Sequence, residues 1–136
     1  RATVTRSVSR KCVRFFYFFP AHFSQLLSIS HASGGYVPSV DIFPTDTVAN
    51  GVATCMMTIM AIKARDLKID LDGTTAEVVK IMNAEPRRIA TIEIVFLMQG
   101  TADQKCKIIL ERAAMTCPVF LSLHPDVEKR ITFNWK

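Results

Sequence analysis

The sequence lacks the short motifs that mark the commonest catalytic and metal-binding sites. It contains no HExxH, no phosphate-binding glycine loop and no Ser-His-Asp signature. Its four cysteines, Cys12, Cys55, Cys106 and Cys117, form no CxxC pair and show no zinc-ligand spacing. We therefore expect no metal site and no bound cofactor. Scattered cysteines also favour a reducing, cytoplasmic setting over a secreted disulfide scaffold.

Acidic residues are missing from the first part of the chain. Residues 1–40 hold five basic residues and no Asp or Glu, whereas residues 41–136 hold 12 basic and 12 acidic residues. A basic arm of this kind could contact nucleic-acid phosphates. The unbroken aromatic run at 15–19, however, is more typical of a buried strand than of a base-stacking surface. We therefore expect no nucleic-acid partner.

The same region has an alternative interpretation as a targeting segment. Basic residues, an apolar stretch at 15–29 and the small residues of Ser30-His31-Ala32 follow the order of a signal peptide. Pro20, His22 and Gln25 interrupt the apolar stretch, which is unfavourable to that interpretation. A cytoplasmic location is the expectation, and a targeting role for the basic N-terminus stays open.

The length and composition predict one globular α+β domain over residues 1–136. The chain has 136 residues, 49% of them hydrophobic and 21% charged, which is ordinary for a folded domain. Alternating residues and turn signals predict the following elements: strands at 2–8 and 12–19, a helix at 44–65, a hairpin of 68–71 with 75–82, a strand at 89–98, a helix opened by a capping box at 101–104, and a strand at 130–135. Strands and helices in this order suit α+β better than a βαβ repeat.

Residues 44–65 predict the central helix of the core. Val48, Val52, Cys55, Ile59 and Ile62 follow helical spacing, and the opposite side is also largely apolar. A helix of this kind is expected to be buried all round, with Cys55 at its middle. Thr45 or Asp46 is expected to cap its first amides. An apolar run of about 15 residues is too short to cross a bilayer, so no membrane partner is expected.

Cys117 precedes Pro118, a residue that suits the first position of a helix. Helix amides at that place favour thiolate, so we expect a lowered pKa for the Cys117 thiol. Cys55 and Cys117 are then a plausible redox pair. From the residues alone the alternative also stands that both are ordinary core cysteines.

The two cysteine segments, PTDTVANGVATCMMTIMAIKARD and CPVFLSLHPDVEKRITFNW, resemble the OsmC/Ohr family of osmotically inducible and organic hydroperoxide resistance proteins. The resemblance covers roughly residues 42–136, whereas residues 1–40 match the family poorly. It implies an OsmC-like α+β fold, with antiparallel sheets around a long buried central helix, in an intertwined homodimer. It also implies that Cys55 is the peroxidatic thiolate and Cys117 the resolving thiol in the reduction of organic hydroperoxides, with an external thiol or dithiol as reductant.

The chain departs from the family pattern at two places. Thr45 follows Pro44 where active peroxidases of the family usually have Glu, and Asp46 comes one position later. No Arg occurs between Arg14 and Arg65, so Arg14 is the nearest upstream candidate for a cation beside the thiolate. The competing expectation is therefore a non-catalytic OsmC-like homodimer that binds an apolar ligand or has a structural role.

Met56 and Met57, next to Cys55, have two possible roles. Methionine side chains usually fill the core, but they also line adaptable apolar pockets. The sequence leaves open whether these two residues contact an organic peroxide.

Overall fold

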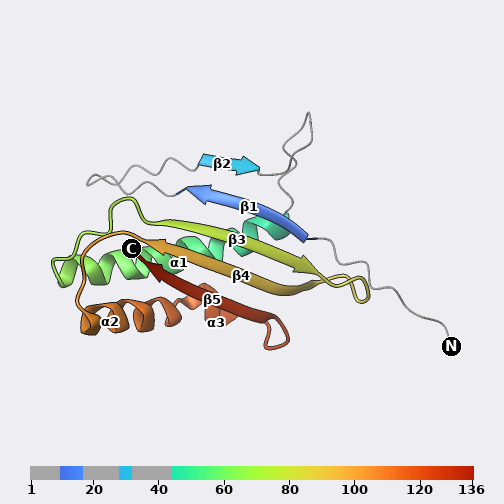
Figure 1. The fold of residues 1–136 in the computed structure, drawn as a ribbon. Coiled ribbons are helices and arrows are strands. Elements are labelled where there is room, and N and C mark those ends of the chain that lie inside the picture. Colours follow the sequence, from blue (N-terminus) through green and yellow to red (C-terminus); the bar gives the residue numbers. More distant parts are fainter. Residues whose placement is uncertain (1–9, 17–27, 32–43) are drawn as a thin grey trace.

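The computed structural model describes residues 10–16, 28–31 and 44–136. These residues form a five-stranded sheet and three helices, which confirms the α+β class (Figure 1). In chain order the elements are β1 (Arg10–Phe16), β2 (Ser28–His31), α1 (Pro44–Asp66), β3 (Thr75–Met82), β4 (Ile89–Met98), α2 (Gln104–Met115), α3 (Pro118–Ser122) and β5 (Glu128–Trp135). The strand expected at 2–8 lies outside the described residues.

The sheet has the strand order β2-β1-β3-β4-β5. The pairs β1–β2, β1–β3 and β3–β4 are antiparallel, as expected. β4 and β5 are parallel, with Ile94 opposite Ile131 and Phe96 opposite Phe133. A parallel pair needs a crossover between its strands, and α2 and α3 supply it. The sheet is therefore mixed at this edge.

The segment between α1 and β3 ends the helix instead of forming a strand. Lys68 adopts a left-handed φ of 55°, and the amide of Ile69 donates to the carbonyl of Ala64. The Asp72-Gly73 turn is present, with φ of 82° at Gly73. β3 pairs with β1 and β4, so the predicted hairpin of 68–71 with 75–82 is wrong. Residues 68–71 make the helix-ending turn, and β3 finds its partners elsewhere in the chain.

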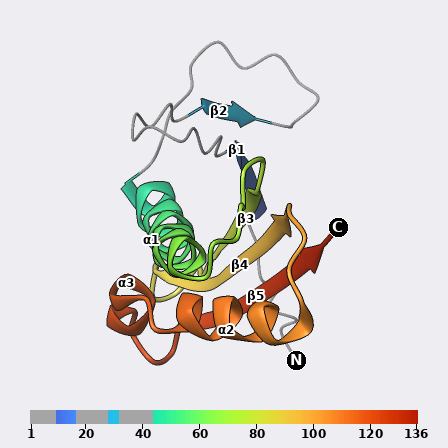
Figure 2. The same ribbon diagram turned by 90° about the vertical axis from the view of Figure 1, so that its left-hand side faces the viewer.

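Helix α1 is buried on one side only. The side chains that face the core are Ala49, Val52, Ala53, Met56, Met57, Met60 and Ala64. Val48 and Ile62, at the two ends of the predicted Cys55 stripe, are 42% and 49% exposed. The expectation of a helix buried all round is therefore wrong. The reason is that α1 lies against β3 and β4 and is flanked by α2 and α3, which leaves one side of the helix uncovered by described residues (Figure 2).

At 23 residues, α1 is also longer than the apolar run read from the sequence. Among the described residues it is the one helix that is long and apolar enough to cross a membrane by length and composition. Core helices of globular domains meet the same criterion, and the side chains on its buried face belong to the same core as the inward residues of β3 and β4.

The three helices contact the same face of the sheet. Alternate residues of β4, namely Ile92, Ile94, Phe96 and Met98, are fully buried on that face. The rings of Phe96 and Phe133 stack there, with centroids 5.2 Å apart. The Trp135 indole donates to Glu111 of α2 over 2.8 Å. The predicted positions of β3, β4 and the inward side of β5 are thus confirmed.

The N-cap of helix α2 lies two residues after Thr101, the cap of the predicted capping box. Asp103 is its N-cap, and the Asp103 carboxylate accepts from the Cys106 amide over 2.8 Å. Leu110 and Ala114 are its buried residues. An aspartate directly before the helix replaces the expected threonine as the cap, because its carboxylate reaches the first free amides.

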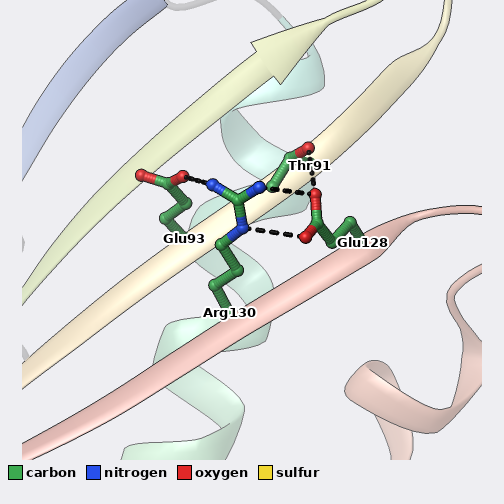
Figure 3. Close-up of polar contacts among 4 residues, drawn as sticks. All are labelled: Thr91, Glu93, Glu128 and Arg130. Atoms are coloured by element: carbon green, nitrogen blue, oxygen red, sulfur yellow. Dashed lines mark hydrogen bonds and ion pairs between the residues drawn. The ribbon is translucent and has the colours of Figure 1, made fainter.

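The opposite face of the sheet carries a polar network across β4 and β5. Arg130 donates to Glu93 over 2.6 Å and to both oxygens of Glu128, and Thr91 donates to Glu128 over 3.3 Å (Figure 3). Neighbouring Arg130 is the largest cause that lowers the pKa of Glu128. These contacts lie on the side of the sheet away from the helices, so they tie the parallel pair together without touching the two core cysteines.

Candidate functional site

Cys55 lies in the middle of α1, at the boundary between its buried and uncovered sides. Its side chain is half-buried and packs against the core formed by the helix and the sheet. Val52 and Met56, on either side along the helix, are fully buried. The thiol is therefore held by a rigid helix and is still partly accessible.

Cys117 lies at the junction of α2 and α3. It is the N-cap residue of α3, and Pro118 occupies the first helical turn, as the sequence predicted. The amide of Cys117 donates to the Ala114 carbonyl at the end of α2, and its carbonyl accepts from Leu121. The whole residue is buried, with 0% of its surface exposed. Both of its backbone groups and its side chain are thereby fixed.

The structure brings these two thiols into contact. The side chains of Cys117 and Cys55 lie close enough to interact, since the Cys55 thiol helps to raise the pKa of Cys117, although one residue belongs to α1 and the other follows α2. Both are free thiols in this state. The two cysteines that the sequence proposed as a pair are therefore neighbours in space, which spacing alone could not establish.

The electrostatics of Cys117 differ from the expectation. Burial, followed by the interaction with the neighbouring Cys55 thiol, raises the pKa of the Cys117 thiol. The amides of Phe120 and Val119 act in the opposite direction but do not outweigh burial. The predicted lowering of this pKa is wrong, because loss of solvent disfavours thiolate more than one short helix favours it.

A cation beside Cys55 was the requirement that the sequence left unfilled. Within residues 44–136, no lysine or arginine forms a hydrogen bond or an ion pair with the Cys55 sulfur. Arg14 lies in β1, where its backbone pairs with Glu77 of β3 and Ser30 of β2. Within residues 44–136 the thiol pair therefore has no basic partner.

Asp46, the acid one position after Thr45, is paired with a lysine of strand β3. Lys80 of β3 points into the first turn of α1, where its ammonium pairs with Asp46 and donates to the Thr45 hydroxyl over 2.6 Å. Only 6% of either charged side chain is exposed. Asp46 thus forms a buried ion pair with the sheet.

Lys80 is the site residue that the sequence reasoning missed. The sequence does contain a sign of this role. Lys80 follows Ala76 and Val78 at alternate positions of the strand, and both of those residues are buried. An inward lysine requires an anionic partner. Asp46, at the start of the helix, is the acid that meets this requirement.

Met56 and Met57 belong to the core. Met56 is fully buried and Met57 is 5% exposed. The core-filling interpretation is therefore the one that the structure supports. Within the described residues, no three His, Cys, Asp or Glu side chains are grouped as metal ligands would be.

Comparison with known proteins agrees with this arrangement. The family model for OsmC-like proteins matches residues 40–132, more than half of the chain. Among solved structures, a protein from Psychrobacter arcticus 273-4, described by osmotic stress induction and a detoxification response, is 32% identical with a TM-score of 0.65. That alignment covers 98% of this chain and 97% of the other.

More distant structures share the fold. An OsmC-like hydroperoxide resistance protein from Jannaschia sp. CCS1 is 13% identical with a TM-score of 0.61, over 86% of this chain and 87% of that one. The organic hydroperoxide resistance protein OhrB of Bacillus subtilis is 16% identical with a TM-score of 0.51, over 95% and 99%. A search of curated proteins gave no match. The matched residues include both cysteines and all of the helices, and the chain belongs to the OsmC family.

Proposed function

We propose that this protein reduces organic hydroperoxides in a peroxide-related stress response, with Cys55 as the attacking thiol and Cys117 as the resolving thiol. The observation that carries the proposal is the proximity of the two thiols, which interact closely enough for Cys55 to raise the pKa of Cys117. Two thiols already in contact need little rearrangement to form a disulfide. Membership of a family that includes hydroperoxide resistance proteins supports the same chemistry.

The assignment of roles follows from accessibility. Cys55 is half-buried on the side of α1 that the described residues leave partly open, so a peroxide can approach it. Cys117 is fully buried, and its pKa is raised by burial. An attacking thiol must be reached by substrate and must lose its proton. Cys55 meets the first condition and Cys117 meets neither.

The proposed reaction has three balanced steps. The Cys55 thiolate attacks the terminal oxygen of ROOH, the O–O bond breaks, and the alkoxide takes up a proton to leave as ROH. The Cys117 thiol then attacks the resulting sulfenic acid, forming a disulfide and releasing water. An external dithiol reduces that disulfide by exchange and becomes oxidised itself. The cycle requires such a reductant, which supports a cytoplasmic location.

A homodimer is part of this proposal. Several large apolar side chains on the helices are exposed, namely Val48, Ile62, Ile108, Ile109, Met115, Val119 and Leu121. Large apolar side chains left exposed in this number are typical of a protein that buries them in an interface, and most soluble oligomers are two-fold dimers. Light scattering should give about 30 kDa, which is twice the 15.2 kDa chain mass. A 15 kDa species that persists at micromolar concentration would contradict the dimer.

A second candidate function is a non-catalytic OsmC-like homodimer that binds an apolar ligand. It is favoured by one observation, the lack of a basic partner for Cys55 within residues 44–136. The two candidates differ in whether the Cys55 sulfur is consumed by peroxide.

Stopped-flow measurement of thiol loss separates them. Wild-type protein, Cys55→Ser and Cys117→Ser are each mixed with cumene hydroperoxide and, separately, with hydrogen peroxide. We expect Cys55→Ser to be inert and Cys117→Ser to stop after one turnover. The organic oxidant should react faster, because burying its hydrocarbon is worth roughly 0.8 kcal/mol per CH₂. Equal slow rates for wild type and Cys55→Ser would establish the non-catalytic alternative.

A further inference from the structure

Gly51 lies one helical turn before Cys55 on α1. Residues four apart in a helix share a face, so Gly51 and Cys55 lie one above the other. Gly51 is half-buried, as Cys55 is. A methyl group built at Gly51 would meet no heavy atom of the described residues within 4 Å. The described chain therefore leaves open space directly beside the turn that carries the thiol.

The backbone conformation at Gly51 does not require a glycine. Gly73 and Gly100 have left-handed φ values of 82° and 110°, a conformation that side chains rarely adopt. Gly51 lies inside the 23-residue helix, where glycine lowers helix stability relative to alanine. Neither conformation nor crowding by described residues excludes a side chain there, so the absence of a side chain calls for another explanation.

Helix geometry relates the open space to the sulfur. Side chains in an α-helix tilt toward the N-terminus and cover the preceding turn. The Cys55 side chain therefore leans toward Gly51 and away from Ile59. A side chain at position 51 would project into the space through which a molecule approaches the sulfur.

Within α1, the surroundings of this space carry no charge, and the hydroxyls of the flanking Thr54 and Thr58 donate to carbonyls of the helix itself. Val48, one turn before Gly51, is 42% exposed, and Ile59, one turn after Cys55, is half-buried. No charged side chain occurs in α1 between Asp46 and Lys63. Such a surface favours a hydrocarbon group over a small hydrated oxidant.

We infer that Gly51 is a specificity-determining residue, which keeps open the space above the Cys55 thiol for the alkyl or aryl group of an organic hydroperoxide. The inference rests on the proposed function, because it assigns the substrate class to the same thiol. Gly51 does not take part in the chemistry. It acts by having no side chain.

The test compares Gly51→Leu and Gly51→Ala with wild type, and uses Arg65→Leu, an exposed position almost three turns beyond Cys55, as the matched control. The rate constant for Cys55 oxidation is measured with cumene hydroperoxide and with hydrogen peroxide. We expect Gly51→Leu to slow the reaction with cumene hydroperoxide about tenfold or more and to change the hydrogen peroxide rate less than threefold. Gly51→Ala should give a smaller change in the same direction with a raised melting temperature, because alanine is the better helix former. Arg65→Leu should change neither rate.

A second readout does not depend on peroxide chemistry. Alkylation of Cys55 by iodoacetamide and by the bulkier N-phenylmaleimide is followed by peptide mass spectrometry, which separates Cys55 from the other cysteines. Gly51→Leu should slow N-phenylmaleimide far more than iodoacetamide. If wild type reduces no peroxide but this size selectivity holds, the proposed function fails while the role of Gly51 in access to the thiol stands.

Two results would overturn the inference. One is an unchanged ratio of the bulky to the small reagent in both Gly51 variants. The other is a loss of the dimer in Gly51→Ala by light scattering, which would assign the open space to close packing against a second chain. Gly51→Ala keeps the test decisive even where Gly51→Leu fails to fold.

Discussion

Lys80 and Asp46 form a buried ion pair that ties the first turn of α1 to strand β3. The pair joins a lysine from the inward face of a strand to an acid at the positive end of the helix dipole. The Thr45 hydroxyl accepts a further hydrogen bond from the same ammonium. Because α1 also carries Cys55, this pair helps to fix the position and rotation of that helix relative to the sheet.

The variant Lys80→Met should be strongly destabilised. It leaves the Asp46 carboxylate buried without its lysine, and removing one member of a buried pair costs about 3–5 kcal/mol. Urea unfolding followed by circular dichroism measures the change. Lys105→Met, at an exposed position in the first turn of α2, is the matched control and should lie within roughly 0.5 kcal/mol of wild type.

The double variant Lys80→Met/Asp46→Asn separates charge from packing. It removes both charges, so it should recover part of the stability lost in Lys80→Met. A Lys80→Met variant as stable as the Lys105→Met control would contradict the structural importance of the pair.

Met56→Ala should lower stability and leave substrate preference unchanged. Met56 is fully buried in the core, and replacing a buried methionine by alanine costs about 2–5 kcal/mol. The ratio of the rates with cumene hydroperoxide and hydrogen peroxide is the second measurement, made at a temperature where the variant is folded. A shifted ratio would place Met56 in contact with substrate, against its burial in the structure.

The stability of the protein should fall as the pH rises above about 8.5, the ordinary pKa of a cysteine thiol. Burial raises the pKa of Cys117 in the folded state, so in this range the unfolded chain loses its proton first and is favoured. Below that range both states hold the proton and no stability is lost. Urea unfolding at several pH values should show a smaller fall for Cys117→Ser than for wild type.

The matched control for this pH dependence is Cys106→Ser. The pKa of Cys106 is raised mainly by its hydrogen bond to Asp103, at an exposed helix start. Because solvent screens that interaction, Cys106→Ser should retain most of the wild-type slope. Equal slopes for wild type and Cys117→Ser would show that burial of Cys117 has little effect on its ionisation.

Local patterns were enough to predict β3, β4, β5 and the long helix. The inward residues Ile92, Ile94, Phe96 and Met98 alternate in the sequence and are all fully buried. The proline after Cys117 marked a helix start that the structure confirms. Features of this kind depend on neighbours in the chain, which a sequence displays directly.

The sequence-based predictions that were wrong concern contacts between segments that are distant in the chain. The two sides of α1 are almost equally apolar, so periodicity could not show that Met56 faces the sheet while Ile62 is exposed. The parallel pairing of β4 with β5 and the contact of Lys80 with Asp46 join distant segments. The raised pKa of Cys117 arises from burial, which outweighs the favourable helix start that the sequence displayed.

The proposed function depends on Cys55 and Cys117 acting together as a redox pair. The most direct measurement treats the reduced protein with about one equivalent of cumene hydroperoxide, blocks the remaining thiols and maps the cysteines by mass spectrometry of a digest. We expect an intramolecular Cys55–Cys117 disulfide in wild type and in Cys106→Ser, with none in Cys55→Ser. Cys55 oxidised to sulfinic acid with Cys117 still a free thiol, or no oxidation of Cys55 at all, would contradict it.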